Sequence, residues 1–402
     1  MRREEEKEEE EEGERGCCET TQCHLVDGPH HMYDRLLHLF HTLQQRRPIA
    51  ADTGGPLEGV EVRGPTGAIR PPLSNAVWTS DATASVQLNA KCQDFITRYL
   101  GRSLLSPDDP SMAQVNRNLL ELAFTYPYLM HASLAVAFTY DRYLNGPSSR
   151  RRRTQEECFH WSRSTVLFNR RLRQPVGARD KDRDPIWATA AALALLSFSS
   201  SPDASAPEHA WPMRPSGASD LEWLRMSKGK MSLWHTVNPL RPDSLFCAMA
   251  AAYAHMHSPL PEEGLGGVPA ALAAVCGLTH ASSSSSSSAA EGGNPYFHPA
   301  HAVSRILDLP DRDVTTGHTQ LFVQTIRGAF EDLLVERDPA ALLLFYLWYR
   351  ATSRATWWID LRARVECSSI CLYLRLYHGD NGAIQAFLPG GPLAGRWDQA
   401  SF

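Results

Sequence analysis

The sequence predicts an all-α protein, with one large helical body behind an acidic N-terminal tail. Beyond Val86 helical signals run almost without a break, and no segment alternates apolar and polar residues as a half-buried strand does. Three Asp-Pro pairs, at 109–110, 184–185 and 338–339, each precede an apolar stretch. Asp accepts hydrogen bonds from the free N–H groups of a first helical turn, and Pro at the first helical position has none to lose. Each pair therefore predicts a helix start.

Two further segments carry helix starts of other kinds. Pro127 opens the apolar segment PYLMHASLAVAFTYDRYL, again with Pro at the first helical position. Ser219 and Glu222 form a capping-box pattern at the start of DLEWLRMSKGKMSLW. Together with the Asp-Pro pairs, these starts and the apolar periodicity predict about eight to twelve helices.

Residues 1–85 are predicted to lie outside the helical body. Residues 1–15 hold nine Glu against four basic residues, and such a like-charge block is expected to be disordered. Met32–Gln45 places its apolar residues on one face, which predicts a short amphipathic helix. Arg46–Pro72 is rich in Pro and Gly without periodicity, and we interpret it as a linker.

The helical body is assigned to residues 86–388, and a Gly/Pro loop follows at 389–402. Two polar loops interrupt the body. Gly146–Glu157 separates two helices, and residues 280–294 form a serine-rich low-complexity segment. The serines bury nothing that offsets their ordering entropy, so we expect a surface insert there.

Charge and cysteine content narrow the class of protein. The formal net charge is −5, and residues 1–15 alone sum to −5, so the remainder is neutral. A neutral body argues against a large electropositive nucleic-acid surface. The nine cysteines are scattered without a secretory signal, so we expect reduced thiols in an intracellular, soluble protein. No apolar run reaches the roughly 20 residues of a membrane span.

The segment GCCETTQCH, residues 16–24, is the densest group of metal-binding residue types. A structural zinc site takes four ligands, usually offered as two spaced pairs. Cys17 and Cys18 are adjacent, which rarely lets both thiolates face one ion, and no second pair follows within reach. We interpret the segment as exposed thiols, and expect neither a metal nor another cofactor in this chain.

Packing or solvation is the simpler interpretation of the remaining clusters. Cys367 and Cys371 share a helix face without a histidine at i+4, and we expect them to pack beside Ile370 and Leu374. Two histidine pairs have chelating spacing but no third ligand: His255 with His257, and His298 with His301.

No motif supports catalysis. A terpenoid-synthase-like all-α enzyme holds Mg²⁺ with acidic pairs on facing helices. Here Asp108 and Asp109 open a turn, and the acids at 180–184 lie in a charged loop. No GxSxG elbow, phosphate loop or HExxH motif is present in the sequence. We therefore expect no enzymatic activity.

Arg150, Arg151, Arg152 and Arg153 form a basic run in the first polar loop. Such a run is typical of a solvated loop or of a nuclear-import signal, and both interpretations stay open. Direct nucleic-acid contact is the weakest interpretation, because four phosphate contacts give only weak, salt-sensitive binding.

Six strings follow one another along the body. They are PYLMHASLAVAFTY (127–140), HWSRSTVLFNRRL (160–172), DPIWATAAALALLSF (184–198), DLEWLRMSKGKMSLW (220–234), NPYF (294–297) and DPAALLLFYLWYR…WWIDLRARVECSSICLYL (338–374). In this order they resemble the regulatory domain of fungal zinc binuclear cluster (Zn2Cys6) transcription factors, in particular the sterol uptake control type. The resemblance covers Val86 to His378.

The resemblance implies an all-α ligand-sensing and transactivation-control domain of a nuclear regulator of RNA polymerase II transcription, as a homodimer that can shuttle from the cytoplasm. Members of the family carry an N-terminal unit in which six cysteines hold two zinc ions. The Cys-x2-Cys-x6-Cys halves of that unit are absent here. Zinc and DNA contact are thus expected only through a missing domain or a partner, and transcription machinery or co-regulator proteins are the expected partners.

The mechanism we expect is an apolar pocket for a sterol or another lipid inside the helical body, with Phe387–Gly395 as a flap. One alternative is that the apolar faces simply pack on one another. Another is an interaction scaffold or co-regulator without a ligand, which recruits partners through its acidic tail and the Met32–Gln45 helix. The candidate pocket residues are Met130, Leu134, Trp187, Leu195, Phe345, Trp348 and Phe387.

Overall fold

The structure is a computed structural model, and it describes residues 77–79, 85–87, 92, 110–145, 153–177, 181–200, 206–217, 220–280 and 293–394. The acidic block, the cysteines at 17–23 and the expected Met32–Gln45 helix lie outside these residues. The first described elements are two short strands, β1 (Val77–Thr79) and β2 (Ser85–Gln87), which pair antiparallel.

The described part of the body is built from helices, which confirms the all-α prediction. The first half contains α3 (Pro110–Thr125), α4 (Pro127–Leu144), α5 (Gln155–Leu172), α6 (Arg183–Ser199), α7 (Glu222–Ser232), α8 (Trp234–Val237) and α9 (Ala250–Ala254). The second half contains α10 (Ala270–Val275), α11 (Phe297–Leu307), α12 (Thr316–Thr325), α13 (Ala329–Glu336), α14 (Pro339–Ser353), α15 (Trp357–Tyr377) and α16 (Gly382–Gln385). Single 3-10 turns are η3 (Pro207–His209), η4 (Leu245–Met249), η5 (His255–His257) and η6 (Asp311–Asp313).

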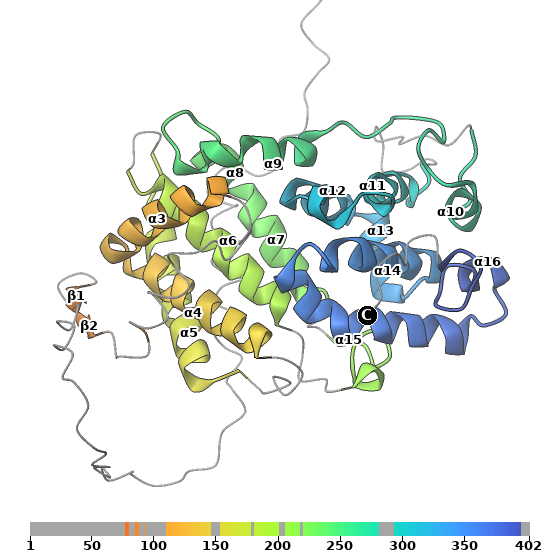
Figure 1. Ribbon diagram of the computed structural model, residues 1–402, viewed down its shortest axis with the longest axis horizontal. Coiled ribbons are helices and arrows are strands. Elements are labelled where there is room, and N and C mark those ends of the chain that lie inside the picture. Colours follow the sequence, from red (N-terminus) through yellow and green to blue (C-terminus); the bar gives the residue numbers. More distant parts are fainter. Residues whose placement is uncertain are drawn as a thin grey trace, which may run out of the picture.

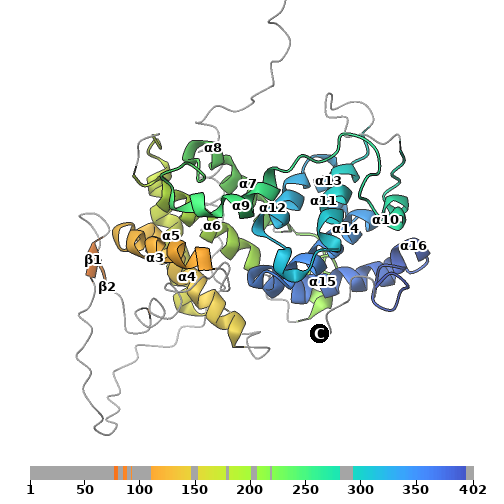
Figure 2. The same cartoon turned by 45° about the horizontal axis from the view of Figure 1, so that its top comes forward.

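The two halves lie side by side, with α7 between them (Figures 1 and 2). Each half has its own core. The N-terminal cluster is formed mainly by α3–α6, α8 and α9, and the C-terminal cluster mainly by α7 and α10–α16. Helices α6, α7 and α15 each have residues in both clusters. Helix α6 places Leu196 in the N-terminal cluster and Phe198 in the C-terminal cluster. Helix α15 begins with Trp357 in the N-terminal cluster, and its later residues belong to the C-terminal cluster.

Helix α14 is buried on all sides because it lies between α11 and α12 on one side and α15 on the other (Figure 1). Its residues from Leu342 to Tyr349 are at most 2% exposed. A helix that is apolar all round is expected in such a central position. Helix α4 has the same role in the first half, where it packs against α3, α5, α6 and α15.

The predicted helix starts are partly confirmed. Helices α3, α4 and α14 begin at the expected Pro110, Pro127 and Pro339. The carboxylate of Asp338 accepts hydrogen bonds from the N–H groups of Ala340 and Ala341, both at 2.9 Å.

Two predicted starts are wrong in detail. Helix α6 begins one residue before Asp184, whose carboxylate instead accepts hydrogen bonds from Ser244 Oγ at 2.8 Å and Leu245 N–H at 2.9 Å. Asp184 therefore holds the η4 turn rather than its own helix. The N-cap of α7 is Leu221, with no side-chain hydrogen bond, so α7 begins two residues later than the capping-box pattern predicted; Ser219 itself lies outside the described residues. Among the described helices, none is long and apolar enough to cross a membrane.

A buried charged network lies in the C-terminal cluster, on helices that also contribute to the N-terminal cluster. Arg362 of α15 is 5% exposed and pairs with Glu366, which is fully buried, at 2.7 Å. The hydroxyl of Tyr349 on α14 donates to the same carboxylate at 2.8 Å. The Arg362 guanidinium also donates to the Phe198 carbonyl at the end of α6, at 2.9 Å, and lies 5.9 Å from the Trp223 ring of α7. The Arg362–Glu366 pair thus connects four helices.

Removal of one partner of this network is predicted to be strongly destabilising. Glu366→Ala leaves the Arg362 charge buried without its carboxylate, which typically costs about 3–5 kcal/mol of unfolding free energy. Replacement of the network as a whole, by Tyr349→Phe, Arg362→Met and Glu366→Leu together, is expected to cost less. Urea denaturation measures both. A loss under about 1 kcal/mol for Glu366→Ala, as for an exposed pair, would contradict the assignment.

Candidate functional site

The structure divides the seven predicted pocket residues between the two clusters. Those in the N-terminal cluster are Met130, Leu134, Trp187 and Leu195, and those in the C-terminal cluster are Phe345, Trp348 and Phe387. Each is at most 6% exposed. These residues therefore do not line one common pocket. Side chains of the same helices fill most of the space between them.

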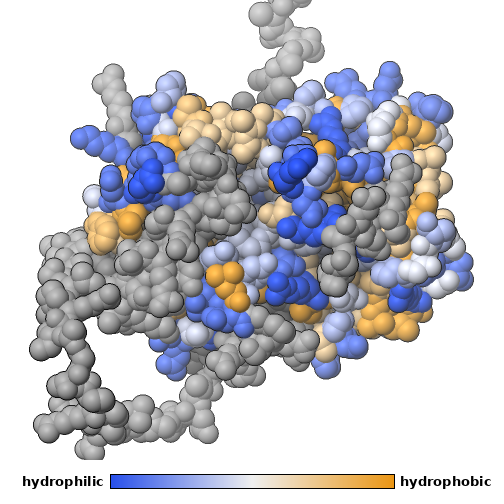
Figure 3. All heavy atoms as spheres, viewed as in Figure 1, coloured by the Kyte–Doolittle hydropathy of each residue, from blue (hydrophilic) through white to orange (hydrophobic). Residues whose placement is uncertain are grey.

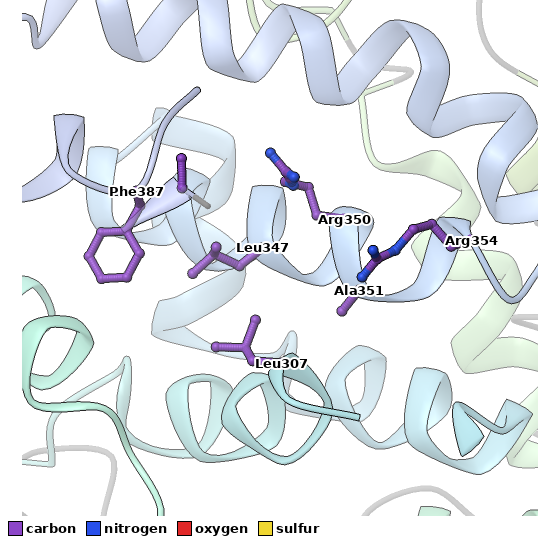
Figure 4. A pocket seen from close by; sticks show the side chains of 7 residues that line it. Leu307, Leu347, Arg350, Ala351, Arg354 and Phe387 are labelled. Atoms are coloured by element: carbon purple, nitrogen blue, oxygen red, sulfur yellow. The ribbon is translucent and has the colours of Figure 1, made fainter. Parts of the chain in front are cut away.

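Phe387 lines a small cavity in the second half of the molecule. Figure 4 shows its ring at one end, Leu307 and Leu347 in the middle, and Arg350 and Arg354 toward the other end. The cavity measures about 10 Å³, which is room for about one water molecule. No sterol enters such a space unless the wall moves.

The two arginines give this cavity a polar side. Arg350 and Arg354 are one turn apart on α14, so both point to the same face. Arg354 Nε lies 3.2 Å from the Asp311 carboxylate, and Arg350 Nη1 donates to the Tyr346 hydroxyl at 3.0 Å. A cavity with apolar walls and guanidinium groups on one side suits a molecule with an apolar body and a polar or anionic head.

The wall opposite α14 is formed by the chain that follows α16. Phe387 and Ala394 both line the cavity, so the two ends of residues 387–394, here named the C-terminal segment, close it. The segment is folded on itself, because Leu393 N–H donates to the Ala386 carbonyl at 2.9 Å. The predicted flap corresponds to this segment, and Gly395 lies outside the described residues.

Two glycines allow the segment to fold so tightly. Gly390 has φ 85°, which favours glycine. A Cβ on Gly391 would lie 2.3 Å from the Gln385 carbonyl oxygen and 2.6 Å from that of Ala386. The fold of the segment therefore depends on residues 390 and 391 having no side chain.

A second hollow borders the same segment from outside. It is open to solvent, measures about 420 Å³, and is lined by Leu393 of the segment, Asp308 at the end of α11 and residues 267–271 before and within α10. Its volume falls in the range of about 300–1,000 Å³ typical of small-molecule sites. The C-terminal segment thus borders both spaces, the open hollow through Leu393 and the small cavity through Phe387 and Ala394.

No protein-family model, curated protein or solved structure matches this chain.

A buried Cys-His-His group lies in the first half. Cys92 Sγ is 3.3 Å from His160 Nε2, and His160 Nδ1 is 2.8 Å from His131 Nδ1. Because His160 contacts one group with each ring nitrogen, it links the thiol to the second imidazole. All three residues are at most 5% exposed.

This group lacks the electrostatics of an activated nucleophile. Burial, and next the neighbouring His160, lowers the pKa of His131 to about 3. Burial lowers the pKa of His160 to about 4, although Glu156 opposes the shift. An imidazolium that would stabilise the Cys92 thiolate is thus disfavoured. The group is better suited to holding α4 and α5 together in a neutral state.

The histidines that the sequence singled out have other partners. His255 stacks on His318 with ring centroids 3.9 Å apart, His257 lies 5.1 Å from the Trp234 ring, and His301 contacts the Gly264 carbonyl at 3.2 Å. Within the part of the chain that the structure describes, no group of three or more His, Cys, Asp or Glu residues is arranged to hold a metal ion.

The remaining candidates are placed as follows. Cys367 and Cys371 are partly buried and pack against the C-terminal cluster, and burial raises the pKa of Cys367 to about 12. Of the basic run, Arg153 is described, and its guanidinium lies 4.5 Å from the centre of the Trp161 ring. Arg150, Arg151 and Arg152 lie outside the described residues.

Sequence reasoning missed the residues with the most unusual environments. They are His131, His160, Lys230, Arg350 and Arg354. His131 and Lys230 did carry a signal, because each interrupts an otherwise apolar face of a predicted helix. Arg350 and Arg354 carried no such sequence signal, because the residues that close the cavity opposite them are far away in the chain.

The histidine pair predicts a loss of stability in acid. Both pKa values lie below the 6.5 of an unfolded histidine, so the unfolded chain binds protons first as the pH falls below 6.5. Between pH 7 and pH 4.5 the pair is expected to remove about 2–5 kcal/mol of unfolding free energy.

Urea denaturation at the two pH values measures this loss against matched variants. His131→Leu with His160→Phe is expected to reduce the pH dependence, whereas replacement of the exposed His235 by Asn leaves it unchanged. An equal pH dependence in the double variant and the unsubstituted protein would refute the role of the pair.

Proposed function

We propose that this protein is a transcriptional regulator whose helical body is a ligand-responsive regulatory domain, as in the zinc-cluster factors that it resembles. Its ligand is a sterol or another lipid with a polar head, which enters where the C-terminal segment now lies. The observation that carries this proposal is that the C-terminal segment closes a cavity next to Arg350 and Arg354 and also borders a ligand-sized open hollow.

The segment has the features of a movable wall. It follows the last described helix, so its displacement breaks no helix, although it removes Phe387 and Leu388 from the C-terminal cluster. Its ring anchor, Phe387, is 1% exposed and occupies the apolar end of the cavity. A lipid that takes the place of this ring gains similar apolar contacts, so exchange of the two is favoured when the lipid is present.

The expected affinity follows from ligand size. A sterol has about 28 heavy atoms, and about 0.3 kcal/mol per atom gives about 8 kcal/mol, which is near micromolar affinity. Such affinity regulates a protein only if one conformation binds the lipid much better than the other. Displacement of the segment provides two such conformations and changes the surface beside α15 and α16.

In the cell this regulator is proposed to act in the nucleus, where it contacts DNA through a further domain or a partner protein. The six strings that carry the resemblance all lie in or beside helices of the body, from α4 to α15. They support the regulatory assignment only as sequence similarity.

Ligand binding is predicted to depend on Phe387. Phe387→Ala removes the ring that the lipid must displace, so we expect the dissociation constant for a sterol or a fatty acid to fall about fivefold or more. Stability falls as well, by about 3–5 kcal/mol for a buried Phe. Calorimetric titration and intrinsic tryptophan fluorescence measure the binding.

The matched control for this variant is Phe330→Ala. Phe330 is 2% exposed and belongs to the same cluster, but it lies on α13 and does not line the cavity. It is expected to lower stability without a change in affinity. The absence of saturable binding of both lipid classes up to about 100 µM, where a micromolar site is nearly full, would overturn the proposal.

An interaction scaffold remains the second candidate, and exposed apolar residues favour it. Leu376 and Tyr377 at the end of α15 are 62% and 63% exposed. Figure 3 shows apolar residues gathered over this side of the molecule, where α15 and α16 end. Large exposed apolar groups often mark protein contacts.

Deletion of residues 1–85 separates the two candidates. For a ligand-responsive domain, the deletion leaves lipid affinity unchanged, because no residue of the cavity is removed. For a scaffold that recruits partners through its acidic tail, it abolishes co-regulator capture and no lipid binds either form. Titration calorimetry and co-precipitation of a tagged chain distinguish the results.

A further inference from the structure

Lys230 occupies an unusual position for a lysine. It lies on α7 and is 8% exposed. Its ammonium donates to the Gln320 side-chain oxygen of α12 at 3.3 Å and lies 5.6 Å from the centre of the Trp187 ring on α6. Trp187 belongs to the N-terminal cluster, and the neighbours of Gln320 in sequence belong to the C-terminal cluster.

Lys230 is a buried cation whose described partners are a neutral amide and the face of the Trp187 ring, with no carboxylate paired to it among the described residues. Its hydrogen-bond acceptor is a neutral amide, and burial lowers the pKa of Lys230 to about 8. No charged neighbour among the described residues contributes to that shift. A buried ammonium without a carboxylate is costly, so any reaction that makes this nitrogen neutral is favoured by the surroundings.

We propose that Lys230 is a modification site that condenses with small aldehydes to form an imine. The nitrogen lone pair of the neutral amine attacks the carbonyl carbon, and the resulting carbinolamine loses water. Overall, one ammonium group and one aldehyde give one imine, one water molecule and one proton. No oxidant or reductant takes part.

The surroundings favour both the reaction and its product. At pH 7 about a tenth of an amine with this pKa is neutral, and the neutral form is the nucleophile. The product carries no charge, so it avoids the desolvation penalty of the ammonium. The Gln320 amide can rotate so that its NH₂ group donates to the imine nitrogen.

Burial selects the size of the aldehyde. The whole residue is 8% exposed and its nitrogen is buried between α6, α7 and α12, so a carbonyl compound reaches it only during brief separation of these helices, which favours the smallest aldehydes. Modification takes place at the contact between the two clusters. A small metabolic aldehyde therefore modifies the protein at the contact between its two clusters, and this reaction does not depend on the lipid site proposed above.

The chain contains a matched control two residues away. Lys228 is on the same helix, is 44% exposed, and pairs with Glu331 at 2.5 Å. Full-length protein is treated with acetaldehyde and cyanoborohydride at pH 7.5, so that any imine is trapped as an ethylated amine. Peptide mass spectrometry then gives the rate at each lysine. We expect Lys230 to be ethylated about tenfold faster than Lys228 in the folded protein and at an equal rate in denaturant.

Two variants of Gln320 test whether the missing carboxylate is the cause of the fast ethylation of Lys230. Gln320→Glu places a carboxylate next to the ammonium and is expected to slow ethylation of Lys230 about tenfold or more. Gln320→Leu removes the acceptor and is expected to accelerate it. Circular dichroism verifies that both variants fold. Labelling of Lys228 with no labelling of Lys230 in the folded protein, or equal Lys230 rates in the two folded variants, overturns the proposal.

Discussion

The buried guanidinium of Arg362 is the constraint on which the rest of the structure depends. Helices α6, α7 and α15 contribute to both apolar clusters, and Arg362 on α15 contacts the other two. Its guanidinium donates to the end of α6, lies near the Trp223 ring of α7 and pairs with Glu366 of its own helix, and that carboxylate accepts a hydrogen bond from Tyr349 of α14. The network places a guanidinium and a carboxylate together in an apolar interior, so removal of either partner carries a large penalty.

Much of the fold could be predicted from local patterns. Pro at the first helical position determined the starts of α4 and α14 because it acts within one turn. Asp184 was predicted to cap its own helix. Its carboxylate instead binds the η4 turn some sixty residues away, a tertiary contact that the local sequence does not show. Helix α7 begins two residues later than the capping-box pattern predicted, because Leu221 adopts a left-handed conformation immediately before it. The division into two clusters was not predicted, because apolar periodicity shows that a face is buried but not what it is buried against.

The site was less predictable than the fold. Large apolar residues such as Trp187 and Trp348 fill the core of any helical body, and periodicity does not reveal which of them leaves a space. Phe387 was found through the Gly and Pro residues that follow it, and these do fold the chain back over α14. Arg350 and Arg354 line a cavity only because the C-terminal segment, more than thirty residues later in the chain, lies opposite them. The neutral state of His131 and His160 arises from burial, which depends on how α4 and α5 pack and not on the neighbours of these residues in sequence.

The central claim is that the two halves form one cooperative unit joined by α15. Native-state hydrogen exchange, followed by mass spectrometry of peptides from α4 and α14, tests it most directly, because these helices form the centres of the two clusters. The account predicts that the slowest amides of both helices exchange with the same free energy of opening, equal to that of global unfolding. Exchange of one helix at a much smaller free energy than the other would show two independent domains and would contradict it.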